Sequence, residues 1–194
     1  MARGPRYRVA YRRRREGKTD YSARRILATS DRPRFVVRIS NKNIVIQLIK
    51  AKVEGDYVLV QANSKELTNY GWLAGTKNTS SAYLLGMLAG KKAVKAGIDE
   101  ANLDLGLVRP TKGSKVFAAV KGAQDAGLWI PCASEIIPEI GRIEGKKISE
   151  YAESIENPFI YEKQFSAYLR KGLKPQNLPD HFNMVKTRIE EAEI

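Results

Sequence analysis

Residues 35–62, FVVRISNKNIVIQLIKAKVEGDYVLVQA, contain three runs rich in β-branched and aromatic side chains. Such runs, when residues of turn composition separate them, are typical of β-strands. Three strands with two short turns between them are therefore predicted, at 35–40, 44–50 and 57–62. Successive strands joined by turns this short form an antiparallel meander.

After this stretch the spacing of apolar residues changes to that of helices. Ser64 is predicted to cap a helix that runs through Leu67 to Trp72, and Thr79 or Ser80 to cap a second helix. The second helix has apolar residues near one face, namely Leu84, Met87, Leu88, Val94 and Ile98. Its Gly86 and Gly90 form a GxxxG motif, which in this chain indicates close packing of helix against sheet.

A fourth strand is predicted at Leu103–Arg109, closed by Pro110, and a third helix at Ser114–Ala126, stopped by Gly127. Val116, Phe117 and Val120 are expected to face inward from that helix. Helices between strands indicate an α/β fold, a layered core in which helices pack on a mixed sheet of the meander plus the fourth strand.

Changes in composition and in expected secondary structure divide the chain into three regions. Residues 1–34 form a basic N-terminal arm in which Asp20 is expected to cap a short helix at 21–28, and residues 35–130 form the α/β core. Residues 131–194 form a helical C-terminal extension, with helices near 148–155, 158–171 and 179–192. Because this extension has few large apolar residues, we expect it to dock against something rather than to fold as an independent domain.

The arm carries most of the basic excess. The chain has a net charge of +13, and residues 1–34 contribute twelve Lys or Arg against three Asp or Glu, a net charge of +9. Such a segment repels itself and has little to bury, so it needs a polyanion to neutralise it. Arginine suits phosphate oxygens, and the interleaved tyrosines Tyr7, Tyr11 and Tyr21 can stack on bases. RNA is favoured over DNA, because no helix-turn-helix, zinc-finger or basic-zipper pattern is present. The alternative is a solvated tail that raises solubility.

Further candidates lie in the core. In a strand of period two, Arg38 and Ser40 share with Val36 the face that the core does not claim, and Asn41 and Lys42 follow at its rim. Gly75 to Asn78 precede a helix N-terminus, where free amides and Lys77 make an anion site. For Arg38 to Lys42, an ordinary polar strand end remains an alternative. For Gly75 to Asn78, the alternative is a plain helix cap. The candidate RNA-binding residues are Arg3, Arg6, Tyr7, Arg8, Tyr11, Arg12, Arg13, Arg14, Arg15, Lys18, Tyr21, Arg24, Arg25, Arg38, Ser40, Asn41, Lys42, Lys77, Asn78, Lys112 and Lys115.

Little in the sequence favours catalysis, and no catalytic residue, metal ligand or cofactor is predicted. The single cysteine, Cys132, is expected to be a small buried residue, and the single histidine, His181, to be exposed, so an intrachain disulfide and a Cys/His zinc site are excluded. The carboxylates Asp56, Asp99, Glu100 and Asp104 are assigned to turns and caps rather than to the metal site of a nuclease. No apolar run approaches ~20 residues, so a cytoplasmic location without a membrane partner is expected. An RNA-processing enzyme with a basic arm and a protein that binds anionic membrane remain as alternatives.

Several longer motifs then resemble the archaeal branch of the large-subunit ribosomal protein family called L-eighteen, whose eukaryotic relative is called L-five. They are residues 12–21 RRRREGKTDY, 33–42 PRFVVRISNK, 62–67 ANSKEL, 70–72 YGW, 77–86 KNTSSAYLLG, 103–107 LDLGL, 116–128 VFAAVKGAQDAGL and 163–168 KQFSAY. The resemblance implies a protein that binds 5S rRNA and helps attach it to the large-subunit rRNA in the central protuberance, beside other ribosomal proteins. It also implies rRNA contacts at Arg12–Arg15, Lys18, Arg38, Asn41, Lys42, Lys77 and Asn78.

Overall fold

The computed structural model describes residues 4–192 and contains a four-stranded mixed sheet in the order β3-β2-β1-β4. The meander consists of β1 (Arg34–Ile39), β2 (Ile44–Ala51) and β3 (Asp56–Asn63), which pair antiparallel. The short β4 (Asn102–Asp104) lies parallel to β1. The predicted meander with a fourth strand and the predicted α/β class are therefore confirmed.

The fourth strand is shorter than the predicted Leu103–Arg109. It ends at Asp104, whose side chain accepts the N–H of Gly106 at 2.8 Å. Gly106 has a φ of +63°, a left-handed conformation that turns the chain out of the sheet. Leu107 and Val108 are consequently exposed in a loop instead of being buried in a strand.

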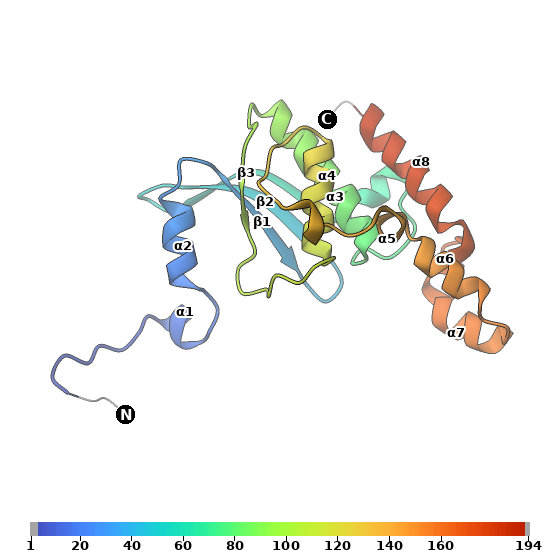
Figure 1. Cartoon of the computed structure of the whole chain (residues 1–194), viewed down its shortest axis with the longest axis horizontal. Helices are drawn as coiled ribbons and strands as arrows, with labels where there is room; N and C mark the ends of the chain where they lie inside the picture. The colour runs from blue at the N-terminus through green and yellow to red at the C-terminus, as the bar shows by residue number, and fades with distance from the viewer. Residues whose placement is uncertain (1–3, 193–194) are drawn as a thin grey trace.

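Two helices, α3 (Thr79–Lys95) and α4 (Lys115–Asp125), complete the core (Figure 1). Alternate residues of the sheet, among them Phe35, Ile46 and Leu48, are fully buried in one cluster with Leu84 and Leu88 of α3. The inward-facing residues predicted for α4 are confirmed, because Val116, Phe117 and Val120 are all buried.

The GxxxG motif packs helix against helix, so the predicted helix–sheet contact was wrong. A Cβ atom on Gly86 would overlap the carbonyl of Ala119 in α4, and one on Gly90 would meet Ala123 and Ala126. Gly122 of α4 meets the backbone of α3 in the same way. Because these glycines have no side chain, the two helix backbones come into direct contact.

Three details of the helices also differ from prediction. Asn78, not Thr79 or Ser80, caps α3, because its Oδ1 accepts the Ser81 N–H at 2.6 Å. Ser64 caps no helix, because its hydroxyl accepts the Ile44 N–H of β2. The helix expected after it is a short 3-10 helix, η1 (Glu66–Tyr70).

Val94 was expected to be buried but is 42% exposed. At 3.6 residues per turn it lies about 80° around α3 from Leu84. That angle places it at the edge of the apolar stripe, where the covering elements no longer reach it.

The arm precedes β1 and contains α1 (Arg12–Arg15) and α2 (Tyr21–Ala28) (Figure 1). Asp20 caps α2, as predicted, by accepting the N–H groups of Ser22 and Ala23. The residues before α1 form an irregular segment that extends away from the sheet.

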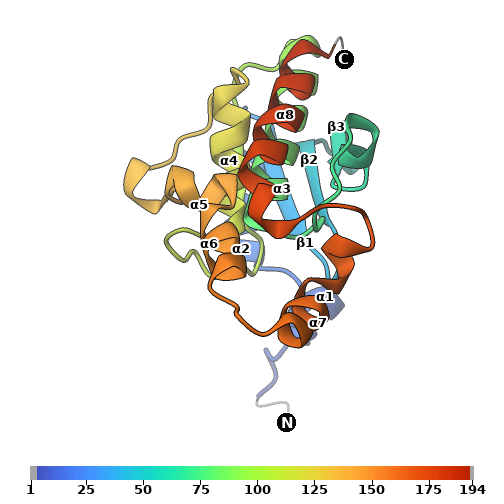
Figure 2. The ribbon, with the colours of Figure 1, turned by 90° about the vertical axis from the view of Figure 1, so that its right-hand side faces the viewer.

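Residues 131–192 of the C-terminal extension contain four helices and two 3-10 turns. They are η2 (Ser134–Ile136), α5 (Ile140–Glu144), α6 (Lys146–Glu153), α7 (Pro158–Leu169), η3 (Pro175–Asn177) and α8 (Leu178–Glu191). Helix α8 packs on α3 (Figure 2), and its Phe182, Val185 and Ile189 belong to the main core cluster. Within residues 4–192, no helix combines the length and the apolar character needed to cross a membrane.

His181 on α8 is buried, so its predicted exposure was wrong. Its ring stacks on Trp72 with the ring centroids 5.2 Å apart, and its Nε2 accepts the Leu73 N–H at 3.1 Å. Burial, and secondarily the nearby Arg188, lower the pKa of His181. The neutral imidazole is thus a structural acceptor between α8 and the core.

Candidate nucleic-acid interface

Arginines and aspartates alternate where the arm meets the sheet. Arg24 of α2 pairs with Asp56 at 2.8 Å, and the other oxygen of Asp56 lies 2.9 Å from Arg34. Arg34 also pairs with Asp104 at 3.1 Å, and Asp104 with Arg38 at 3.0 Å. We call these five residues the arginine–aspartate network. It joins the helix of the arm to three strands of the core.

Strand register explains this placement. Arg34 and Arg38 project from the same face of β1, and Asp104 lies on the neighbouring strand opposite Val36. The opposite face of β1 holds Phe35 and Val37 against the core helices. The carboxylates that pair with Arg34 come from β4, which adjoins β1, and from β3, which lies beyond β2.

Arg34 is the most buried member of the network, with its side chain only 4% exposed. Its Nη2 lies 2.9 Å from Asp56 but outside hydrogen-bond geometry, so the contact with Asp56 is an ion pair alone. Burial by itself would raise the pKa of Asp56, but Arg24 and Arg34 hold that pKa below its ordinary value. Both carboxylates thus anchor arginines, a role that the sequence did not suggest, and Asp104 also accepts the Gly106 N–H in the turn that was predicted for it.

The predicted arm cations lie on the surface. The described candidates from Arg6 to Lys18 are all exposed, as is Arg25, whereas Tyr21 and Arg24 are half-buried. Within the arm, Arg12 and Lys18 both pair with Glu16, at 2.9 and 2.7 Å. The candidate Arg3 lies outside the described residues.

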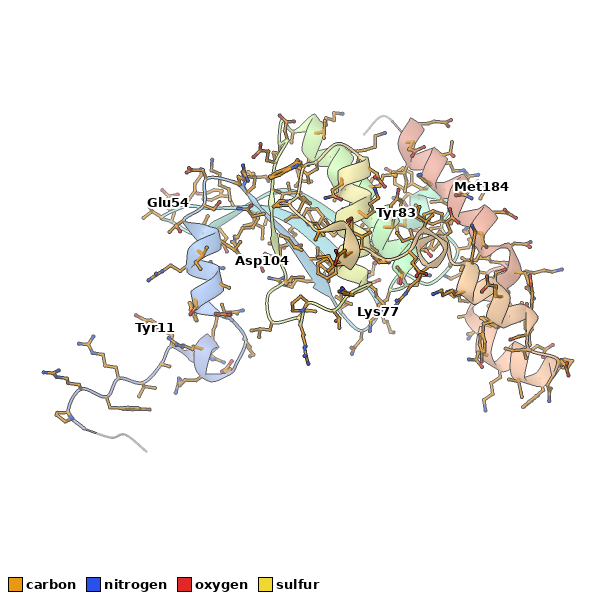
Figure 3. The ribbon with its side chains drawn as sticks, viewed as in Figure 1. Tyr11, Glu54, Lys77, Tyr83, Asp104 and Met184 are labelled. Atoms are coloured by element: carbon orange, nitrogen blue, oxygen red, sulfur yellow. The ribbon has the colours of Figure 1, made fainter. Side chains whose placement is uncertain are left out.

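The structure brings part of the arm together with Arg38. A cleft of about 660 Å³ separates the arm from the loop after β4, and its basic lining residues are Arg13, Lys18, Arg24, Arg34 and Arg38. Asp104 lies in this cleft, between α2 and the core helices in the view of Figure 3. Arg38 is 47% exposed, but its guanidinium already donates to the side chain and the carbonyl of Asp104.

Gly106 covers the same guanidinium. A Cβ atom at this position would lie 3.0 to 3.2 Å from three atoms of the Arg38 side chain. The left-handed turn after β4 thus presses its backbone onto Arg38 and holds the side chain in place. Any contact of Arg38 with RNA would be made by a rigid group.

The remaining core candidates gather around a second hollow, a pocket of about 650 Å³ at the N-terminus of α3. Lys42, Lys77, Asn78 and Lys115 all line it. Ser40 and Asn41 are exposed in the turn that carries Lys42. Lys112 is exposed as well and lies 3.8 Å from Glu135, outside this pocket.

No metal site is formed by the part of the chain that the structure describes, since no three His, Cys, Asp or Glu side chains cluster there. Asp56 and Asp104 are each bound to arginines, and Glu100 pairs with Arg32 at 2.6 Å. Cys132 is half-buried, and burial raises the pKa of its thiol.

Sequence reasoning missed the burial of Arg34 and two further basic residues of the pocket, Arg142 and Lys147. No local signal marked the burial of Arg34, because arginine is rarely buried unless it is paired, and its partners Asp56 and Asp104 are distant in the sequence. No local signal marked Arg142 and Lys147 either, since their place depends on how the C-terminal extension docks.

Comparison with known proteins adds the family. The family model described as ribosomal large subunit proteins 60S L5, and 50S L18, matches residues 5–101 and 95–133. The large ribosomal subunit protein uL18 of Thermofilum pendens is 52% identical over 194 residues, covering 99% of each chain. Its counterpart from Methanothermobacter thermautotrophicus is 52% identical over 191 residues, and covers 98% of this chain and 99% of its own. That from Aeropyrum pernix is 51% identical, covering 99% of this chain and 91% of its own.

These matches extend over nearly the whole chain, from the arm through the C-terminal extension. They confirm the resemblance seen in the sequence motifs. The chain belongs to the family of large-subunit ribosomal proteins described as 60S L5 and 50S L18.

Proposed function

We propose that this protein binds 5S rRNA and helps attach it to the large-subunit rRNA in the central protuberance, beside neighbouring ribosomal proteins. Its family consists of structural constituents of the large ribosomal subunit and not of enzymes. Family membership therefore argues against the alternative of an RNA-processing enzyme. The place proposed for the chain is the large subunit of cytoplasmic ribosomes.

One observation carries the proposal: a row of exposed cations precedes a helix that is ion-paired to the core. Seven basic side chains lie on residues 6–18, which are exposed and precede α2 in the arm (Figure 1). Helix α2 itself is fixed to the core by the Arg24–Asp56 ion pair. A polyanion bound to the arm would therefore be held at a defined position relative to the sheet.

The two parts of this interface have different physical roles. Phosphate contacts by Arg and Lys supply affinity and depend on salt, whereas aromatic rings stack on unpaired bases. Tyr7 and Tyr11 are 51% and 82% exposed, so their rings are available for stacking (Figure 3 labels Tyr11). Arg38 and the turn after it would then contact the RNA from the core.

Chemical probing of 5S rRNA with and without the full-length protein tests this proposal. We expect a compact set of protected nucleotides that Arg13→Gln/Arg14→Gln weakens. The matched control, Arg170→Gln/Lys171→Gln, removes the same charge from exposed positions in the C-terminal extension and should leave the protection unchanged. Equal protection of an unrelated RNA of the same length, or equal loss with both variants, would contradict the proposal.

A further inference from the structure

The pocket at the N-terminus of α3 has an unusual charge. Five of the residues that line it are basic, and none is acidic. The basic residues are Lys42, Lys77, Lys115, Arg142 and Lys147. The arginines of the arginine–aspartate network are each paired with an aspartate, so this gathering of cations without a carboxylate in the lining indicates a site for an anion.

Five separate elements supply these cations. Lys42 comes from the β1–β2 turn, Lys77 from the loop before α3, and Lys115 from the first turn of α4. Arg142 and Lys147 come from α5 and α6 in the C-terminal extension. The core therefore forms three sides of the pocket and the extension completes it.

Most of these charges have no counter-ion in the part of the chain that the structure describes. Among residues 4–192, Lys147 pairs with the exposed Glu139 at 3.3 Å, and the other four form no ion pair. Burial, followed by the charges of Lys77 and Arg142, lowers the pKa of Lys115. The folded protein thus holds Lys115 in surroundings that disfavour its charge.

The N-terminus of α3 adds hydrogen-bond donors to the positive charge of the pocket. Asn78 caps α3 and satisfies the Ser81 N–H, but the N–H groups of Thr79 and Ser80 have no hydrogen-bond partner among the described residues. The Nδ2 atom of Asn78 is also buried without an acceptor. The start of a 17-residue helix carries partial positive charge and binds anions through such free amides.

The loop that bears these donors is fixed in place. Thr76 donates its hydroxyl to the carbonyl of Lys42 at 2.6 Å, which ties the loop to the β1–β2 turn. Lys77 lies on the same lower side of the molecule as Tyr11 of the arm in the view of Figure 3. One RNA could therefore reach the arm and the pocket together.

We propose that this pocket binds a backbone phosphate of 5S rRNA, and that Arg142 and Lys147 of the C-terminal extension complete the binding site. The inference rests on the proposed function, because it takes the same RNA as the ligand. It assigns the extension a direct part in RNA binding, in addition to its packing against the core.

Binding of 5S rRNA to the full-length protein and to single variants tests the pocket. Arg142→Gln and Lys115→Gln should each weaken binding about tenfold, because each removes a charge-assisted contact. Each should also reduce the negative salt slope by about 0.7–0.9. Lys146→Gln is the matched control: Lys146 lies beside Lys147 but pairs with Glu144 at 2.8 Å and does not line the pocket.

Urea unfolding of the same proteins separates binding from folding. Lys115→Gln removes a charge that its surroundings disfavour, so the free variant should be at least as stable as the wild type while it binds RNA more weakly. A variant that is less stable and binds normally would contradict the inference.

Two further results would overturn the pocket alone. In the first, Arg142→Gln and Lys115→Gln bind 5S rRNA as tightly as Lys146→Gln, while loss of the arm still weakens binding. In the second, inorganic phosphate raises the melting temperature through Arg142, but RNA affinity does not depend on that residue. If the wild-type chain failed to bind 5S rRNA at all, the proposed function itself would be wrong.

Discussion

Asp104 links two arginines, and its replacement by asparagine should destabilise the protein strongly. The substitution keeps the size of the side chain and removes its negative charge. Arg34 and Arg38 are then deprived of partners at 3.1 and 3.0 Å. The two effects differ in weight, because the Arg34 side chain is 4% exposed and that of Arg38 is 47% exposed.

The magnitude follows from the burial of each partner. An exposed ion pair contributes about 0–1 kcal/mol, so the effect at Arg38 is small. Removal of one partner from a buried pair costs about 3–5 kcal/mol, because the other charge is left uncompensated. Arg34 retains Asp56 at 2.9 Å, which favours the lower end of that range. We expect the free energy of unfolding to fall by about 3 kcal/mol, against a typical stability of about 5–15 kcal/mol.

Urea unfolding followed by circular dichroism measures this change. With an m value of about 1–3 kcal/mol/M, the midpoint of Asp104→Asn should fall by about 1–3 M and the slope should stay constant. The control Glu135→Gln, at an 82% exposed carboxylate 3.8 Å from Lys112, should change stability by less than about 0.5 kcal/mol. The cost of Asp104→Asn should persist in an Arg38→Gln background. A decrease below about 1 kcal/mol would refute the assignment of Arg34 as a charge that depends on Asp104.

Two other substitutions test the packing of the helices. Gly86→Ala should destabilise the protein by about 1–3 kcal/mol or more in urea unfolding, because the new methyl group overlaps the Ala119 carbonyl. The control Gly141→Ala, whose Cβ meets only ordinary contacts, should not destabilise it. Equal stability of the two variants would disprove the close helix contact. Burial, and then Arg188, lower the pKa of His181 in the folded protein. Below about pH 6.5 the unfolded chain therefore binds a proton at His181 more readily than the folded protein does. The free energy of unfolding should consequently fall between pH 7 and pH 5. His181→Gln should abolish that decline, measured by urea unfolding at both pH values; an unchanged decline would assign it to other groups.

The sheet could be predicted from the sequence because its information is local. Period-two patterns and short turns identify β1, β2 and β3 within a few residues of their observed bounds. The fourth strand was predicted too long, because an apolar run alone does not show that a side chain such as Asp104 turns the backbone two residues later.

The network and the pocket depend on distances that no local pattern contains. Arg34 meets carboxylates 22 and 70 positions away, at Asp56 and Asp104. Lys115 and Arg142 line one pocket only because α5 docks on α3. Residue type and spacing select the cations that are proposed to bind RNA, whereas their grouping into a cleft and a pocket required the fold.

The central claim is that the N-terminal arm binds 5S rRNA through its cations. The most direct test is the salt dependence of 5S rRNA affinity for the full-length protein and for a chain that lacks residues 1–18. The truncation removes eight basic side chains, of which Arg12 and Lys18 share Glu16 in the free protein. If about six of these side chains bind phosphates, the negative slope of log affinity against log salt should fall by about 4–5, and affinity at low salt should drop steeply. Unchanged affinity and an unchanged slope would contradict the account.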